Sequence, residues 1–462
     1  MPQHRLFGLR MKEKTSPKTF QAAAAAVDIT PDIGSPLGGY LLRQGVSRGV
    51  LDPIRARLLY VSSGDEDILL VSLDFIHVMG EWSDRLAHIV GEAAGVEPGR
   101  VVVWAIHTHS GPGVFRSAHV GWDGDGERRY LEGVAKKIAD AARRLPGLAT
   151  PALLRVGGAH VRGLGSHRNE PDRAVDDELV SARFVTESGD TVARLINYGC
   201  HPTVLGPENL LFSADFVGEG LSRLDAEGGG VSLFLNGGSG DVSTRFTRNE
   251  KDREGDRERF GRLLAEAAGE AQKGEEQVEG RAVSVETTET RVAYRGYPDV
   301  EVARQAYERA EGNLARETGE GADPGRIRRL ESVREGALVT LLLAGMGGPS
   351  AHFGERSMDT AVTLVCIGGL SIVFFPGEVM SETSIALKRD MDAPLMVCGY
   401  TGDYFGYLAR SKAEEGGNED GDGAAYESLM AILDAESIGR LIDRAKQMLV
   451  QSIATNRKER KL

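Results

Sequence analysis

Apolar and polar positions alternate in two different ways along the first half of the chain. Short apolar runs are separated by longer amphipathic stretches from about residue 22 to residue 247. Such runs are typical of buried strands, and the amphipathic stretches are typical of the helices that cover them. The predicted strands are 57–61, 68–74, 101–107, 152–156, 182–185, 193–198 and 232–236, and the predicted helices are 82–94, 127–144, 216–224 and 251–273.

A second block of elements follows a charged, Glu-rich stretch at 273–280, which predicts a solvated connector. The block opens with a predicted strand at 282–294 and continues into a charged helical hairpin from 300 to about 343, broken at 319–325. An acidic, glycine-rich stretch at 414–423 predicts a mobile loop that acts as a lid. The remaining predicted elements are strands at 360–367, 370–375 and 395–399, a helix after Pro376, and a terminal helix at 437–452.

These elements predict a single α/β domain, with a mixed β-sheet core layered with helices and a charged helical insertion at about 300–343. Because there is no internal repeat and no long linker, we expect the domain to span residues 22–452. A basic leader at 1–21 precedes it, and a basic tail at 453–462 follows it. The leader lacks the long leucine-rich segment of a secretory signal, so we expect a cytoplasmic protein.

The composition of the chain argues against a nucleic-acid partner and against a membrane-spanning segment. The 462 residues include 55 Lys and Arg against 68 Asp and Glu, a formal net charge of -13. This acidic balance repels phosphate backbones, so no nucleic-acid partner is expected. No run reaches the roughly 20 apolar residues that span a bilayer, so no transmembrane segment is expected. Cys200, Cys366 and Cys398 lie in apolar stretches, which predicts buried thiols rather than disulfides. The sequence makes no prediction of an oligomeric state.

The first candidate for chemistry is the end of the strand predicted at 101–107, where His107 and His109 precede a Ser-Gly-Pro turn. If the extended backbone continues through Thr108, side chains two residues apart point to the same side, so the two imidazoles can reach one point. Such a pair suits a metal ion or an acid–base pair. The alternative is two polar residues that merely end a strand.

Two further strand ends carry groups of the same kind. His201 follows the strand predicted at 193–198, and Glu378 follows the strand predicted at 370–375. A third imidazole and a carboxylate fit the nitrogen and oxygen ligands that catalytic zinc sites combine. The alternatives are a histidine that is only hydrogen-bonded and a glutamate that complements a helix dipole.

Two glycine-rich loops complete the candidates. The loop at 236–243 lacks the lysine of a P-loop, so nucleotide binding is not expected, but it can bring Ser243 and backbone N–H groups close to a substrate carbonyl. The loop at 399–407 is rich in Gly and Tyr, and its alternative interpretation is an aromatic-packed turn. Both loops follow apolar strands, at the place where α/β folds build their sites.

Taken together, these motifs resemble the catalytic domain of the neutral (alkaline, non-lysosomal) ceramidase family, zinc amidases that cleave the N-acyl bond of ceramide. The resemblance covers about 24–442 and is most specific at His-Thr-His-Ser-Gly-Pro, 107–112. It also rests on Val-Asp-Ile-Thr-Pro at 27–31, Gly-Gly-Tyr at 38–40, Val-Ser-Leu-Asp at 71–74, His-Pro-Thr at 201–203, Gly-Asp-Val-Ser at 240–243, Pro-Gly-Glu at 376–378 and the spacing of Tyr404 and Tyr407.

The resemblance implies a zinc site and the groups around the reacting amide. Its implied zinc ligands are His107, His201, Glu378 and Tyr407. Its implied catalytic residues are His109, which passes a proton to the leaving nitrogen, Ser243 beside the amide, and Arg168 and Tyr426 at the oxyanion. Asp74 and Asp215 are candidates for orienting the ligands, with buried structural carboxylates as the alternative.

The chain also departs from the family. It ends soon after the catalytic block, so the family's C-terminal immunoglobulin-like domain is expected to be absent, and Thr244 stands where many members have Pro. We therefore expect a zinc-dependent hydrolase of a C–N amide bond in ceramide or another N-acyl lipid. The alternatives are a metallohydrolase of a small polar amide, which the charged insertion suits, and a non-catalytic metal- or carbohydrate-binding protein that keeps the fold.

Overall fold

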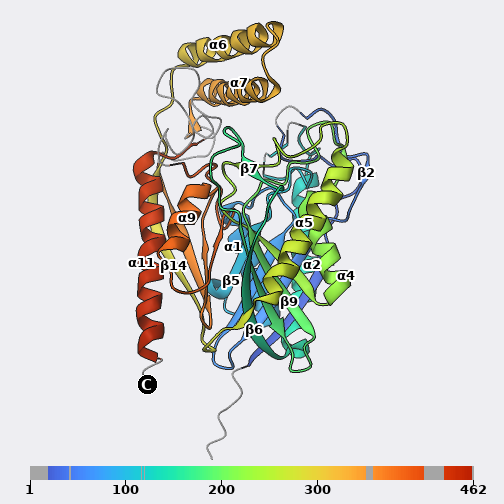
Figure 1. Cartoon of the computed structure of the whole chain (residues 1–462), viewed down its shortest axis with the longest axis vertical. Coiled ribbons are helices and arrows are strands. Elements are labelled where there is room, and N and C mark those ends of the chain that lie inside the picture. The colour runs from blue at the N-terminus through green and yellow to red at the C-terminus, as the bar shows by residue number, and fades with distance from the viewer. Residues whose placement is uncertain are drawn as a thin grey trace, which may run out of the picture.

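Two β-sheets packed face to face form the centre of the molecule, and helices cover both outer faces (Figure 1). This computed structural model describes residues 19–40, 43–115, 117–118, 120–349, 357–409 and 431–459. The predicted α/β architecture with a mixed sheet is confirmed.

The large sheet has the strand order β11-β9-β8-β6-β1-β3-β4-β5. Its pairs are antiparallel except at the two edges, where β11 lies parallel to β9 and β4 lies parallel to β5. Its strands are β1 (Phe20–Asp28), β3 (Arg55–Ser62), β4 (Asp67–Leu73), β5 (Val101–Ala105), β6 (Thr150–His160), β8 (Glu178–Val185), β9 (Thr191–Tyr198) and β11 (Val231–Asn236). A short strand, β13 (Glu276–Gln277), pairs with β6.

The small sheet has the order β14-β15-β16-β17, with a parallel last pair. Its strands are β14 (Val283–Ala293), β15 (Ser357–Ile367), β16 (Leu370–Phe374) and β17 (Leu395–Cys398). Alternate residues of the large sheet, such as Leu59 and Val61, share one buried cluster with Ile372 and Phe374 of the small sheet. Each sheet therefore has one face against the other sheet and one face against helices. Its strands are apolar on both faces, which explains their nearly continuous hydrophobic runs.

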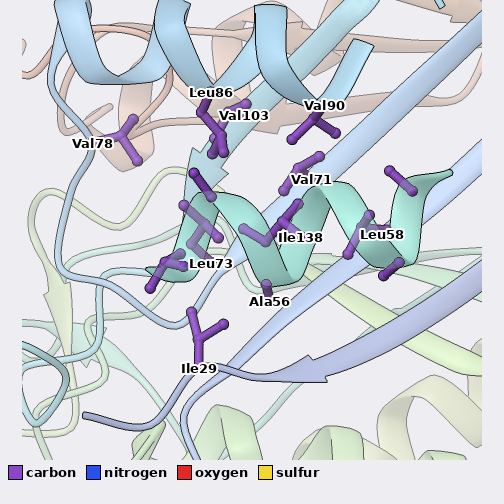
Figure 2. Close-up of a cluster of buried hydrophobic side chains, with 14 of the residues drawn as sticks. Ile29, Ala56, Leu58, Val71, Leu73, Val78, Leu86, Val90, Val103 and Ile138 are labelled. Carbon is purple, nitrogen blue, oxygen red and sulfur yellow. The ribbon is translucent and has the colours of Figure 1, made fainter. Parts of the chain in front are cut away.

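Helices fill the two outer layers. Leu58 and Tyr60, the alternate positions of β3, pack against α1 (Gly80–Ala94) and α2 (Gly126–Ala142). Figure 2 shows Leu86 and Val90 of α1 beside Val71 and Val103 of the sheet. The helix α4 (Asp215–Gly228) packs on β11, and α5 (Arg253–Lys273) packs on α4, β6 and β8. The helices α9 (Ser381–Arg389) and α11 (Ala435–Glu459) cover the small sheet.

The charged insertion forms the predicted helical hairpin, α6 (Val300–Gly319) and α7 (Pro324–Gly345), which stands beyond the ends of the sheets in Figure 1. The shorter elements are β2 (Gly49–Val50), η1 (Pro98–Arg100), α3 (Leu145–Leu148), β7 (Ser166–His167), β10 (Leu211–Phe212) and β12 (Val242–Ser243). No helix in the described ranges is both long enough and apolar enough to span a membrane.

Several details differ from the sequence-based expectations. The strand predicted at 101–107 ends at Ala105, because His107 adopts a left-handed backbone conformation with φ 72°. The connector predicted at 273–280 is exposed, as expected, but contributes β13. Among the predicted buried thiols, Cys200 and Cys398 are buried and Cys366 is half-buried, and all three are free. The lid predicted at 414–423 lies outside the described residues.

The Arg57–Asp74 pair tests how much the large sheet depends on one buried ion pair. Arg57 donates to both oxygens of Asp74, at 3.0 and 3.1 Å, and both side chains are buried. The variant Arg57→Met leaves a buried carboxylate without its cation, so we expect a loss of about 3–5 kcal/mol in the free energy of unfolding. Urea unfolding followed by circular dichroism measures it.

The matched control is Arg128→Met on α2, since Arg128 pairs with Asp125 and Glu132 on an exposed surface. Its expected loss is about 0–1 kcal/mol. Equal losses in the two variants would contradict the structural role given to the buried pair.

Candidate metal centre

The ends of strands from both sheets meet at one point, where the backbone of residues 399–401 joins them. Gly399 N donates to Asn236 O at the end of β11, Ala105 N at the end of β5 donates to Tyr400 O, and Tyr400 N donates to Gly377 O. Asn236 Nδ2 also donates to Ile106 O at 3.1 Å. The loops that follow β5, β9, β11, β16 and β17 consequently face a common centre.

His107 and His109 come together, but for a different reason from the one predicted. The extended backbone does not continue through Thr108, because His107 has φ 72°. The two rings nevertheless meet nearly at right angles, with their Nε2 atoms 3.2 Å apart. Gly39, with φ 102°, makes room for this turn, since a Cβ there would lie 2.6 Å from the Cα of His109.

Backbone carbonyls decide which ring nitrogen of His107 and of His201 carries the proton. Nδ1 of His107 lies 2.7 Å from Ile76 O, and Nδ1 of His201 lies 2.7 Å from Ser239 O. A carbonyl oxygen can only accept, so each Nδ1 carries the proton and each Nε2 keeps its lone pair for the centre. This arrangement is usual for histidines that bind a metal.

Glu378 and Tyr407 are paired by backbone contacts. Glu378 N donates to Gly406 O at 2.8 Å, and Leu408 N donates to Glu378 O at 2.9 Å. Gly377 permits this close approach, because a Cβ there would lie 2.6 Å from Gly406 O. The alternative of a glutamate serving a helix dipole does not hold: α9 begins at Ser381, and the Glu378 carboxylate faces the histidines instead.

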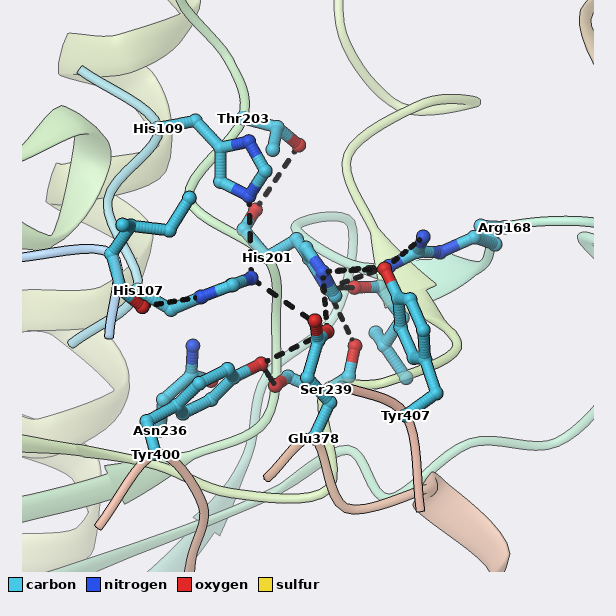
Figure 3. A network of polar contacts seen from close by, with 12 residues as sticks. His107, His109, Arg168, His201, Thr203, Asn236, Ser239, Glu378, Tyr400 and Tyr407 are labelled. Carbon is cyan, nitrogen blue, oxygen red and sulfur yellow. Dashed lines mark hydrogen bonds and ion pairs between the residues drawn. The ribbon is translucent and has the colours of Figure 1, made fainter. Parts of the chain in front are cut away.

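Three distances among the donor atoms of these four residues are close to those expected between ligands of one zinc ion. Glu378 Oε2 lies 3.0 Å from His201 Nε2 and 3.6 Å from His107 Nε2, and Tyr407 Oη lies 3.5 Å from His201 Nε2. Ligands at 2.0–2.1 Å from a tetrahedral zinc are about 3.3 Å apart. Figure 3 shows the four side chains pointing toward one another. The nitrogens of His107, His109 and His201 also lie within 4.8 Å of one another, so a metal ion could be held here.

Burial keeps the imidazoles neutral. The exposed fractions are 1% for His107, 2% for His201, 2% for Glu378 and 4% for Tyr407, and His109 is half-buried. Burial lowers the pKa of all three histidines well below the ordinary value of 6.5, because charged imidazolium loses its hydration. A neutral imidazole is the form that binds a metal.

Arg168 reaches the same centre. It donates to Tyr407 Oη at 3.1 Å, and its Nη2 lies 2.7 Å from Nδ1 and 2.8 Å from Nε2 of His201. Arg168 is buried and has no bulk water to screen its charge.

Ser243 lies beside the centre in β12, whose backbone forms a bridge with His201. Its Oγ accepts from Arg245 N at 3.3 Å. Tyr426 lies outside the described residues. Asp74 binds the Arg57 side chain and accepts from Arg55 N at 2.8 Å, and Asp215 accepts from Leu205 N at 3.0 Å. These contacts agree with the alternative of buried structural carboxylates.

Four residues around the centre have no role in the sequence-based prediction. Tyr400, Tyr404 and Ser239 lie inside the two glycine-rich loops, and His77 follows β4. Tyr404 and Tyr400 donate to Glu378, and Tyr404 stacks on His77, so the aromatic-packed turn is present as well. The strand-end rule that selected His107 and His201 would also have selected His77.

Fold and site together define a class: a two-sheet α/β protein with a buried imidazole, carboxylate and phenol cluster at its strand ends. No protein-family model matches the chain, and no curated protein matches it. Two solved structures share the fold. One is a ceramidase complexed with C2, with TM-score 0.67 and 15% identity, covering 92% of this chain and 74% of that chain.

The second is the neutral ceramidase from Pseudomonas aeruginosa, with TM-score 0.67 and 16% identity, covering 95% of this chain and 75% of that chain. The predicted resemblance to the ceramidase catalytic domain is therefore confirmed at the level of the fold. At these identities, the chemistry still has to be argued from the residues.

The lowered pKa values predict that His107, His109 and His201 of the metal-free protein remain neutral at pH 5.5, where an ordinary histidine is about nine-tenths protonated. As the pH falls, the histidines of the unfolded chain are protonated at a higher pH than those of the folded protein. The contribution of these groups to stability is therefore present above about pH 6.5 and is lost as the pH falls below it.

Nitrogen-15 NMR of histidine-labelled protein, with signals assigned through single His→Asn variants, measures the titration. Titration of the three rings with midpoints near pH 6.5 would contradict the burial argument.

Proposed function

We propose that this protein is a zinc-dependent hydrolase of a C–N amide bond, and that its substrate is ceramide or another N-acyl lipid amide. The observation that carries the proposal is the close approach of buried donor atoms: Glu378 Oε2 lies near His107 Nε2 and His201 Nε2, and Tyr407 Oη lies near His201 Nε2. The likeness of this fold to two structures described as ceramidases supports the substrate class.

Zinc fits the donor set better than the alternative metals. Two imidazoles, one carboxylate and one phenol give a mixed nitrogen and oxygen set in four positions, which zinc accepts, whereas magnesium and calcium prefer six or more oxygen ligands. When bound, zinc supplies a Lewis acid and lowers the pKa of a coordinated water toward about 7.

His109 is proposed to transfer the proton rather than to bind the metal. Its ring is half-buried, whereas His107 and His201 are buried and have backbone carbonyls that orient them. A neutral His109 accepts a proton from the attacking water and donates it to the leaving nitrogen, so that the acid and the amine are released.

Arg168, Ser243 and Tyr426 are proposed to hold the reacting carbonyl. A neutral amide presents no charge in its ground state, so rate enhancement must come from donors matched to the tetrahedral oxyanion. Arg168 is a buried cation beside Tyr407, and Ser243 lies beside His201. We also propose that the protein acts in the cytoplasm, as the sequence of its leader predicts.

A small polar amide is a second candidate, and the hairpin favours it. Arg329 on α7 donates to Asn169 O at 3.3 Å, next to Arg168. Burial raises the pKa of Glu335 on the same helix, and the nearby charges of Arg245 and Arg168 oppose that rise. Charged groups of α7 therefore lie close to Arg168. Comparing kcat/KM for long-chain ceramides with that for short N-acyl amides decides between the two substrates.

The metal assignment predicts different losses in different variants. His107→Ala and His201→Ala remove a nitrogen ligand, so we expect them to lose both zinc and activity. Ser243→Ala should keep its zinc and lose turnover, because it only positions substrate. Zinc per chain, measured by mass spectrometry of the purified proteins, and hydrolysis of N-acyl substrates provide the two readouts.

Wild-type protein that binds no zinc, or equal zinc loss in all three variants, would contradict the assignment.

The oxyanion assignment predicts kinetic losses without loss of binding. Arg168→Ala and Tyr426→Phe remove donors to the transition state, and loss of one such donor typically costs about 10²–10³ in kcat. We therefore expect kcat to fall with little change in KM. A wild-type kcat in either variant would remove that residue from the mechanism.

A further inference from the structure

The two oxygens of Glu378 are held by different partners. Oε2 faces the histidines, at 3.0 Å from His201 Nε2 and 3.6 Å from His107 Nε2. Oε1 accepts a short hydrogen bond, 2.5 Å long, from the phenol of Tyr404. The carboxylate is buried, so its rotation is decided by these side chains rather than by water.

The Tyr404 ring is itself fixed in place. It stacks on the imidazole of His77, with ring centroids 4.3 Å apart and planes only 6° from parallel. Its backbone is tied to the same turn as Glu378, because Phe405 N donates to Pro376 O at 3.0 Å. Tyr404 therefore has little freedom to move away from the carboxylate.

The neighbouring Tyr400 closes the other side of the carboxylate. Its ring stacks on His107 at a centroid distance of 4.1 Å, and its phenol lies 2.8 Å from Ser239 Oγ and 3.4 Å from Glu378 Oε2 (Figure 3). Tyr400 and His107 have φ values of 60° and 72°. Non-glycine residues rarely adopt this region, and they persist there where the surroundings fix them, most often at functional sites.

We propose that Tyr404 is a positioning residue that holds Glu378 by Oε1 and so presents Oε2 alone to the metal. This inference rests on the proposed metal site and adds a residue to which sequence analysis gave no role. Hydrogen-bond partners of metal ligands commonly contribute 10–100-fold to metal affinity, because they fix the orientation of the ligand.

The test measures the zinc dissociation constant of the full-length protein by competition with a chromophoric chelator. Tyr404→Phe keeps the ring on His77 and removes only the hydrogen bond, so the expected result is about 10–100-fold weaker zinc binding. The matched control is Tyr130→Phe, which removes another phenol that donates to Ile29 O at 2.7 Å, away from the centre. The control should bind zinc like the wild type.

A double-mutant cycle separates positioning from general loosening of the fold. If Tyr404 acts through Glu378, adding Tyr404→Phe to Glu378→Gln should change zinc affinity by less than about threefold. A merely structural tyrosine would weaken binding equally in both backgrounds. The proposal is overturned by that equal effect, or by a Tyr404→Phe variant whose zinc affinity equals that of the wild type.

Two further outcomes are distinguished. If Tyr404→Phe fails to fold, the variant His77→Ala is measured in its place. Removing the ring that stacks on Tyr404 should also weaken zinc binding. Wild-type zinc affinity in His77→Ala would overturn the proposal. If the wild-type protein binds no zinc, the proposed function fails together with this inference. Zinc binding by the wild type that Tyr404→Phe leaves unchanged overturns the inference alone.

Discussion

The candidate site depends on one short segment, residues 399–401, whose backbone hydrogen bonds connect the two sheets. The segment pairs with the ends of β5 and β11 and with the turn at Gly377, and Asn197 adds buried bonds to Leu235 O and Val397 O. A buried backbone group without a partner costs about 1–3 kcal/mol, so these strand ends have one satisfied arrangement. That arrangement gathers His107, His201, Glu378 and Tyr407, which come from four loops far apart in the sequence.

Burial then sets the chemistry of the gathered groups. It lowers the pKa values of the histidines and keeps their lone pairs available, and it leaves the charge of Arg168 unscreened. The same low polarity strengthens the contacts of Tyr400 and Tyr404 with Glu378. A neutral substrate such as an amide suits this environment, because its charge develops only during the reaction, beside donors already in place.

Much of the fold follows from the sequence because strands buried on both faces leave long apolar runs. β1 is the exception, since its run of alanines has weak strand preference, and it forms a strand by pairing with β3 and β6. The strand-end rule identified His107, His109, His201 and Glu378. It could not reveal the φ of His107 or the roles of His77 and Tyr404, which arise from contacts between distant segments. Asp74 and Asp215 illustrate the opposite case, where the bonds of a buried carboxylate go to a structural arginine or to the backbone.

The central claim is that zinc binds to His107, His201, Glu378 and Tyr407, with His109 left to transfer protons. Anomalous diffraction at the zinc absorption edge, from crystals of protein purified with zinc, tests this claim most directly. The account predicts one zinc peak per chain with these four side chains at about 2.0–2.2 Å. A peak bound by His107, His109 and His201 without Glu378 and Tyr407, or no peak at this centre, would contradict it.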